Sequence, residues 1–169
     1  MRSGHTLQLG DGEFAHATHP PVQDIRDLLA FKIARIAAIH GKAGQGWTQK
    51  EFGLRLSEWR ILGIVAAMQP VAFNEIARAT GMDKGQLSRI INHERMSAFL
   101  TARPCRSDNR TIELLTTQAG RELHDRMLAF ALQRNQAIAS HFTQQEIDDL
   151  FRLIGKLSDH LTRSAEEPT

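Results

Sequence analysis

Apolar residues recur at helical spacing along much of the chain, and this pattern predicts a mainly α-helical protein. A first helix is expected from Asp24 to about His40. Its apolar face is formed by Ile25, Leu28, Leu29, Ile33, Ile36 and Ala37. The glycine-rich segment 41–46 is expected to end this helix as a linker. A phosphate loop is less favoured, because no strand precedes the segment and it lacks a final Gly-Lys-Ser/Thr.

A second helix is expected from Ser57 to Met68. Ser57 is a residue type that caps helix N-termini well, and Glu58 places a negative charge in the first turn, where it suits the helix dipole. Pro70 follows the last apolar residue and closes the helix.

The next segment, from Asn74 to His93, has the spacing of a helix-turn-helix. Asn74 is expected to cap a short helix over residues 75–80, and Gly81 is expected to end it in the left-handed conformation. Asp83 then opens a second helix, with Gln86 at the position that completes a capping-box pattern. The unit is therefore read as helix, tight glycine turn and helix.

The second helix of this unit carries polar residues suited to a DNA major groove. Basic side chains pair with phosphates or guanine edges, and Asn and Gln match adenine edges. The residues concerned are Lys84, Gln86, Ser88, Arg89 and Asn92, opposite Leu87, Ile90 and Ile91. The same residues also suit an ordinary solvated helix face, so this helix alone leaves both interpretations open.

Two β-prone stretches after the helices favour the DNA-binding interpretation. Residues 99–103 and 111–115 alternate and are β-branched enough to form two strands, with residues 104–110 as the turn. A helix-turn-helix followed by such a hairpin is a winged helix. Arg106 and Arg110 would lie at the wing tip, where a basic side chain can enter a minor groove or contact phosphate.

The charge distribution agrees with this interpretation. The segment from Asn74 to Arg110 holds seven lysines and arginines against four acidic residues, a local charge of +3, whereas the whole chain carries +2. Positive charge is therefore concentrated in the segment that would contact DNA.

Two further helices are expected at the C-terminal end. Thr116 or Thr117 caps a long helix that runs to about Ala139, and Thr143 with Glu146 forms another capping box. The last helix carries a regular apolar stripe formed by Ile147, Leu150, Phe151, Ile154, Leu157 and Leu161. A stripe of this kind needs a partner helix, and the first helix has a matching one. A dimer made by both termini is favoured over packing within one chain.

Composition and length limit the other classes of protein. The chain has 169 residues, 41% of them hydrophobic, which is enough to bury a core. The longest apolar run, Ile61–Met68, is far shorter than the roughly 20 residues that span a bilayer. The N-terminus lacks the apolar core of a secretory signal, and a single cysteine excludes an intrachain disulfide. A cytoplasmic protein is expected.

These elements divide the chain into five regions. We expect a flexible N-terminal arm over 1–21, an N-terminal dimerisation helix and linker over 22–56, and a winged helix-turn-helix DNA-binding region over 57–116. C-terminal dimerisation helices follow over 117–163, with a flexible tail over 164–169.

Several other functions are weighed against DNA-binding regulation. His16 and His19, or Cys105 beside two arginines, would suit a metal or redox sensor, although an N-terminal arm and an incidental thiol explain them as well. A non-specific architectural DNA protein is a further alternative. No arrangement typical of an enzyme active site stands out, and no cofactor or metal is expected.

Three segments resemble the MarR (multiple antibiotic resistance regulator) family of winged-helix repressors. They are LSEWRIL (56–62), EIARATGMDKGQLSRII (75–91) and RSDNRTIELLTTQAGRELHDRM (106–127), within a resemblance that covers about residues 24 to 163. In that family the Asp-x-Arg of the wing, here Asp108 and Arg110, is an element in which the acid holds the arginine for DNA. The chain departs from the family pattern at Glu94 and Ala98, which leaves the packing of that connection open.

The resemblance implies a homodimer that binds a pseudo-palindromic double-stranded DNA operator with two recognition helices. It also implies a repressor that is released by a small effector, often an aromatic carboxylate. The implied dimer interface includes Ile25, Leu28 and Leu29 with the stripe of the last helix. The implied effector pocket lies near Lys32, Arg35, His40, Trp47, Trp59 and Arg60. Trp59 is more often a core residue than a ligand contact, and His40 suits the end of a helix equally well.

Overall fold

The computed structural model describes residues 21–105 and 111–166. The predictions for His16 and His19, for residues 1–20 of the expected arm over 1–21, and for Arg106, Asp108 and Arg110 concern residues outside these ranges. The chain divides into two compact units, Met1–Ala43 and Gly44–Thr169. The fold is mainly helical with a small three-stranded antiparallel sheet, which confirms the expected class.

The first unit consists of a short 3-10 helix and the beginning of a long helix. The 3-10 helix η1 spans Ile25–Asp27, and the Asp24 carboxylate caps it by accepting from the Arg26 N–H at 2.8 Å. The helix α1 then begins at Leu29 and continues to Phe52 in the second unit. None of residues 21–43 is buried.

The expected linker at residues 41–46 was wrong, because these residues are helical. Gly44 is buried, and a Cβ there would lie 3.0 Å from Leu56 Cδ2, so glycine permits close packing. Gln45 Oε1 also accepts from the Leu56 N–H at 3.0 Å, and Thr48 is fully buried. This tertiary packing outweighs the poor helix propensity of glycine.

The helix α1 ends instead at Gly53, which has a φ of 67°. The Gly53 N–H donates to Gln49 O at 3.1 Å and the Leu54 N–H donates to Thr48 O at 3.2 Å. The Gly53 hydrogen bond is that of the αL motif, in which a left-handed residue closes the last turn. Leu54 is only 1% exposed, so the chain re-enters the core directly after the turn.

The helices α2 (Leu56–Met68) and α3 (Phe73–Thr80) begin earlier than expected, for one shared reason. In α2 the Arg55 N–H donates to Glu58 Oε2 at 2.7 Å, and in α3 the Ala72 N–H donates to Glu75 Oε2 at 3.0 Å. A glutamate in the first turn satisfies a free N–H in both cases. Ser57 and Asn74 therefore lie inside their helices and were wrongly expected to be N-caps.

The remaining caps of the helix-turn-helix are confirmed. Gly81 has a φ of 68° and ends α3 in the left-handed conformation. The helix α4 (Lys84–Ile91) begins after Asp83, whose Oδ1 accepts from the Gln86 N–H at 2.8 Å. A short helix α5 (Glu94–Ser97) then follows, which the sequence did not predict.

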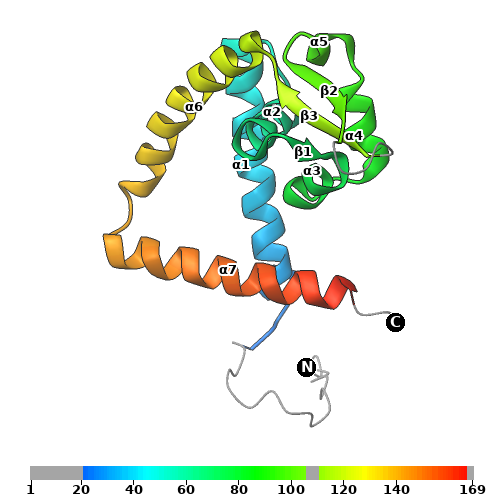
Figure 1. Ribbon diagram of the computed structural model, residues 1–169. Coiled ribbons are helices and arrows are strands. Elements are labelled where there is room, and N and C mark those ends of the chain that lie inside the picture. Colours follow the sequence, from blue (N-terminus) through cyan, green and yellow to red (C-terminus); the bar gives the residue numbers. More distant parts are fainter. Residues whose placement is uncertain (1–20, 106–110, 167–169) are drawn as a thin grey trace. The chain divides into compact units, whose positions relative to one another are not determined.

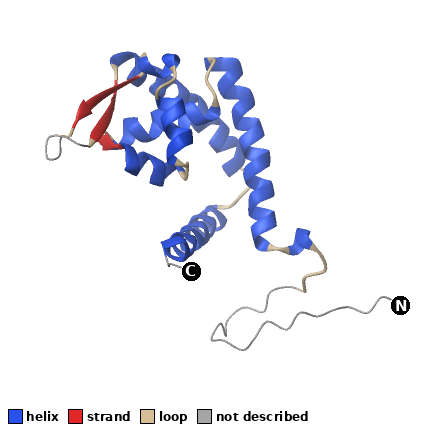
Figure 2. Ribbon diagram, turned by 90° about the vertical axis from the view of Figure 1, so that its right-hand side faces the viewer, coloured by secondary structure: helices blue, strands red, loops and turns tan. Residues whose placement is uncertain are grey.

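The sheet has the order β1-β3-β2, with antiparallel pairs throughout. The wing strands β2 (Leu100–Pro104) and β3 (Ile112–Thr116) lie within one residue of their expected positions. The additional strand β1 (Val71–Ala72) pairs with β3 so that Val71 faces Leu114. Figure 1 shows the strands beside α3 and α4, and Figure 2 shows β2 and β3 as a hairpin next to these helices.

The two C-terminal helices confirm the expected caps. The helix α6 (Gln118–Ala139) is capped by Thr117, whose Oγ1 accepts from the Gly120 N–H at 3.0 Å. The helix α7 (Gln144–Glu166) begins with a complete capping box. The Thr143 N–H donates to Glu146 Oε2 at 2.8 Å, and the Glu146 N–H donates to Thr143 Oγ1 at 3.3 Å.

The core of the second unit lies between α2, α3, α4, α5 and the sheet. Its buried residues are Ile61, Leu62, Val65, Val71, Ile76, Ala77, Leu87, Met96, Leu100 and Leu114. The short α5 contributes Met96, which is fully buried. Within residues 21–105 and 111–166, no helix is both long and apolar enough to cross a bilayer.

Candidate nucleic-acid interface

The recognition helix α4 separates into a polar face and a core face as expected. Leu87 is fully buried, and Ile90 and Ile91 pack against the same core. On the other side, Lys84, Gln86, Arg89 and Asn92 are exposed, and Ser88 is half-buried. The five residues proposed for DNA contact therefore remain available on the surface of the helix.

Hydrogen bonds hold part of this polar face in place. Asn92 Nδ2 donates to Ser88 Oγ at 3.2 Å, one helical turn apart. Arg89 Nε donates to Gly85 O at 3.3 Å, which draws the arginine along the helix. Side chains held in this way lose less conformational entropy when they bind a ligand than free ones do.

Two hollows lie beside α4. The larger one, of about 520 Å³, lies at the helix-turn-helix corner and is lined by Asn74, Ala77, Arg78, Gly81, Met82, Asp83 and Lys84. The other, of about 440 Å³, lies between α4, the start of α3 and the wing strands, and Asn74, Ser88 and Asn92 are among its lining residues. Sequence reasoning did not single out Arg78, because its position depends on how α3 packs against α4.

The base of the wing is fixed by a cross-strand ion pair. Arg103 and Glu113 are register partners in β2 and β3, and Arg103 Nε lies 3.2 Å from Glu113 Oε2. The Cys105 N–H donates to Thr111 O at 2.8 Å and continues the ladder beyond the strands. Cys105 is half-buried. The roles of Arg106, Asp108 and Arg110 remain predictions.

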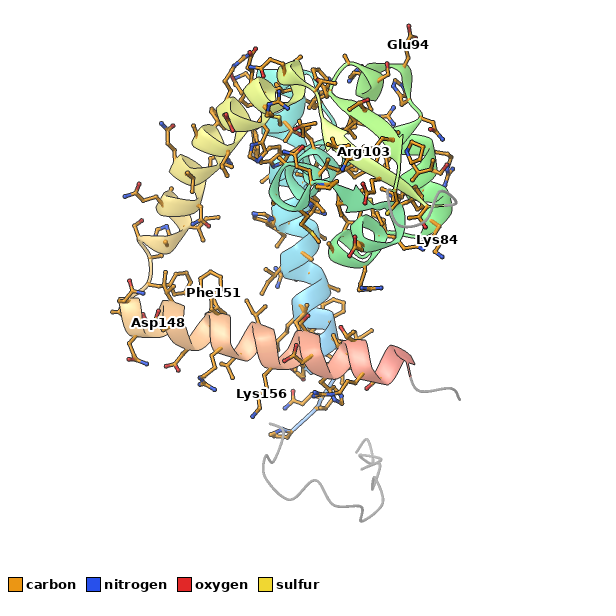
Figure 3. The ribbon with its side chains drawn as sticks, in the orientation of Figure 1. Lys84, Glu94, Arg103, Asp148, Phe151 and Lys156 are labelled. Carbon is orange, nitrogen blue, oxygen red and sulfur yellow. The ribbon has the colours of Figure 1, made fainter. Side chains whose placement is uncertain are left out.

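The connection from α4 to β2 is anchored by Arg95 in addition to the buried Met96. Arg95 Nη1 donates to Gly53 O at 2.5 Å and lies 3.7 Å from Glu58 Oε2. Glu58 is only 2% exposed, so this cation compensates a buried carboxylate. Figure 3 shows Glu94 directed outward from α5, in the first turn where its charge suits the helix dipole.

The departure at Ala98 is also accommodated. Thr117 Oγ1 donates to Ala98 O at 2.7 Å, and the Thr117 N–H donates to Phe99 O at 2.9 Å. Two hydrogen bonds thus join Ala98 and Phe99, just before the wing, to the start of α6.

The proposed effector residues fall in both units. Lys32, Arg35 and His40 lie in the first unit and are exposed, as is Arg60 in the second unit. Trp47 and Trp59 belong to an aromatic cluster of the second unit, with ring centroids 6.5 Å apart. Phe130 lies 5.3 Å from Trp47 and His124 lies 5.6 Å from Trp59. The two tryptophans therefore contribute to packing, as their residue type favours.

The metal-sensor alternative finds no site in the described part of the chain. Residues 21–105 and 111–166 contain no group of three or more His, Cys, Asp or Glu side chains placed to hold an ion.

Comparison with known proteins relates this arrangement to one family. Residues 52–110 match the sequence model described as "MarR family", a range that covers the helix-turn-helix and β2. No curated protein matches the chain.

Solved structures share the fold over most of the chain. A MarR/EmrR family transcriptional regulator from Acinetobacter sp. ADP1 is 24% identical, with a TM-score of 0.74 over 79% of this chain and 94% of that one. MepR of S. aureus, solved with DNA, is 15% identical, with a TM-score of 0.70 over 79% and 98%. PcaV of Streptomyces coelicolor, solved with its natural ligand, is 16% identical, with a TM-score of 0.68 over 83% and 98%.

The family match falls on the segment that forms the core of the winged helix, and the fold extends the likeness to the helices on either side. Over residues 52–110 the chain is thus similar to the MarR family, and its fold is that of the winged helix-turn-helix regulators solved from that family.

Proposed function

We propose that the chain is a homodimeric repressor that binds a pseudo-palindromic operator and is released by a small ligand. The observation that carries the DNA-binding part is the exposed polar face of α4, opposite a fully buried Leu87. Its side chains include the residue types that contact phosphates and the edges of guanine and adenine. The structure of MepR with DNA supports the same use of this fold.

The dimer is supported by apolar side chains that the single chain leaves uncovered. On α7, Leu150 is 45% exposed, Phe151 is 70% exposed and Ile154 is 54% exposed. In the first unit, Ile25 is 62% exposed and Leu29 is 55% exposed. Several exposed large apolar side chains on one element are typical of an interface. We propose that a second copy covers it, with Leu28, Ile147, Leu157 and Leu161 as further interface residues.

The dimer determines the form of the operator. A two-fold pair of recognition helices enters two major grooves that face the same way, about 34 Å or ten base pairs apart. The operator should therefore consist of two inverted half-sites at that spacing. A dimer that occupies such a length of promoter DNA excludes the polymerase, which is the basis of repression.

The proposed releasing ligand is a small aromatic carboxylate. PcaV was solved with its natural ligand, and a MarR protein of Staphylococcus aureus was solved with salicylate and kanamycin. Cationic and hydrogen-bonding side chains suit a carboxylate, and aromatic side chains suit a ring. The first unit offers Lys32, Arg35 and His40, and the second unit offers Trp47, Trp59 and Arg60. These six residues remain the proposed effector residues.

A binding titration tests the proposal. Fluorescence anisotropy would follow the purified protein on the DNA upstream of its own gene and on a scrambled duplex of equal length. The titration is repeated with a panel of aromatic carboxylates. We expect selective binding to the upstream DNA that one compound abolishes. Equal, weak and salt-sensitive binding to both duplexes would favour an architectural DNA protein instead.

A further inference from the structure

Gly85 occupies an unexpected position in the recognition helix. It is the second of the eight residues of α4 and is exposed. Glycine destabilises a helix interior relative to alanine, because it loses more backbone freedom on folding. A glycine in so short a helix therefore needs a reason that offsets this loss.

The two usual structural reasons for a glycine do not apply at position 85. Among the described residues, the glycines with positive φ are Gly53 and Gly81, so the backbone of Gly85 is open to any residue. Close packing does not require glycine either. A Cβ at Gly120 would lie 2.1 Å from the backbone atom Phe99 O. A Cβ at Gly85 would lie 3.3 Å from Asp83 Oδ1, a tight contact with the end of a side chain, which has to shift by a few tenths of an ångström.

Gly85 lies on the side of α4 that is proposed to face DNA. Arg89 and Asn92 follow it at four and seven residues, which places all three on one side of the helix. That side is opposite the buried Leu87. Its neighbour Lys84, at the start of α4, is directed away from the core in Figure 3. The glycine thus leaves the backbone of the first turn of α4 without a side chain on the candidate interface.

We propose that Gly85 is a specificity-determining residue that lets base-pair edges in the major groove approach the backbone of the first turn of α4. In helix-turn-helix proteins the N-terminal residues of the recognition helix reach the base edges, so a methyl group here would hold the helix away from them. Glycine serves this purpose wherever a backbone must come close to a ligand. The inference rests on the proposed DNA-binding function.

The substitution Gly85→Ala tests the inference, because it should affect folding and binding in opposite directions. The melting temperature should rise by about 1–4 °C, since alanine favours the helix. Affinity for a duplex selected from a random pool should fall by about ten-fold or more, the effect of losing one good base contact. Affinity for random-sequence duplex should change by less than about two-fold, with an unchanged salt slope, because no charge is altered.

Two matched variants complete the test. Gly46→Ala replaces an exposed glycine of α1 whose added Cβ would meet nothing within 4 Å, so it should leave binding to both duplexes unchanged. Asp83→Ser combined with Gly85→Ala keeps a cap residue but shortens the side chain that approaches the new Cβ. One result would overturn the inference: Asp83→Ser alone keeps the wild-type selective affinity, and the double variant regains it. The glycine would then serve the Asp83 cap and not the contact with DNA.

Other results would separate a failure of the inference from a failure of the proposed function. Unchanged selective affinity in Gly85→Ala, or an equal loss on both duplexes, overturns the role in specificity. A wild-type protein that selects no duplex from the pool would contradict the proposed function itself, and this result is obtained before any variant is measured.

Discussion

Gly120 lies in the first turn of α6 against the backbone of Phe99, and the fold leaves no room there for a side chain. An added Cβ would lie 2.1 Å from Phe99 O and 3.2 Å from Phe99 Cα. Backbone atoms cannot rotate away as a flexible side chain can. We expect Gly120→Ala to destabilise the protein by about 2–3 kcal/mol, the range of a severely overpacked site.

Urea unfolding followed by circular dichroism measures this effect. Gly46→Ala is the matched control, because its site is open and alanine should stabilise the helix by about 0.5–1 kcal/mol. Equal unfolding midpoints for Gly120→Ala and the wild type would show that the start of α6 can shift away from Phe99.

The ion pair between Glu58 and Arg95 is a second feature that depends on individual side chains. Glu58 is 2% exposed, while the Arg95 side chain is 45% exposed and also donates to Gly53 O. Arg95→Met removes the cation and leaves the buried carboxylate uncompensated. We expect a loss of about 1–2 kcal/mol, less than for a fully buried pair, because Arg95 is partly solvated.

A double-mutant cycle separates this pairing from simple packing. Glu58→Gln removes the charge that Arg95 compensates, so the combined variant should be less destabilised than the sum of the two single variants. Additive free energies of unfolding would show that the carboxylate and the guanidinium do not interact.

At the scale of elements, the sequence predicts helices better than it predicts their ends. Amphipathic periodicity identified α2, α3, α4, α6 and α7 correctly, because the spacing of apolar residues reflects one buried face. The starts of α2 and α3 were misplaced, since Glu58 and Glu75 accept from the preceding N–H groups in place of a serine or asparagine cap. The glycines at 41–46 were misread, because only the packing of Gly44 against Leu56 shows that helix is favoured there.

The same reasoning explains which parts of the candidate site were found. The polar residues of α4 follow from the period of one helix. The contact of Arg95 with Gly53 joins residues 42 positions apart, and no local pattern signals it. The two-residue strand β1 is too short for alternation to be visible. The hollow lined by Arg78 arises only when α3 and α4 pack together.

The capping box of α7 provides a prediction about pH at this scale. The Thr143 N–H and then the Thr143 hydroxyl, both bonded to Glu146, hold the pKa of the Glu146 carboxyl below its usual value of 4.5. A carboxyl whose pKa is lowered by folding stabilises the folded state above its unfolded pKa. This contribution is lost as the pH falls through the lowered folded value.

Carboxyl titration by NMR checks this assignment. Thr143→Ala removes the hydroxyl hydrogen bond, so the pKa of Glu146 should rise toward its usual value. Asp149, whose pKa is lowered mainly by its hydrogen bond with Arg152, serves as the internal control and should not change. A Glu146 pKa that is already at its usual value in the wild type would contradict the capping box.

At the scale of the whole molecule, the chain keeps its basic surface and its uncovered apolar surface on different elements. Lysines and arginines are concentrated between Asn74 and Arg110, whereas most of the uncovered apolar side chains lie on α6, on α7 and in the first unit, with Met68 of α2 and Ile112 of β3 as further exposed residues. We therefore propose that the residues that join two copies differ from those that contact DNA. Assembly and DNA contact can therefore be tested by independent substitutions.

Phe151 is the residue at which the proposed dimer is most directly tested. It is 70% exposed, so Phe151→Asp should leave the fold of the single chain intact while placing a charge in the proposed interface. Figure 3 shows Phe151 and Lys156 leaving α7 on different sides, which makes Lys156→Asp a matched control on the same helix. Sedimentation velocity should then show a monomer for Phe151→Asp and a dimer for the wild type and the control.

Loss of the dimer should also weaken operator binding, although no DNA-facing residue is changed. In a dimer the second half-site is bound at a high effective concentration, and linkage of this kind contributes about 10²–10⁴-fold in affinity. Phe151→Asp should lose a factor of this order on a two-half-site duplex but little on a single half-site. A variant that still sediments as a dimer would mean that other apolar residues of the proposed interface hold the two copies together without Phe151.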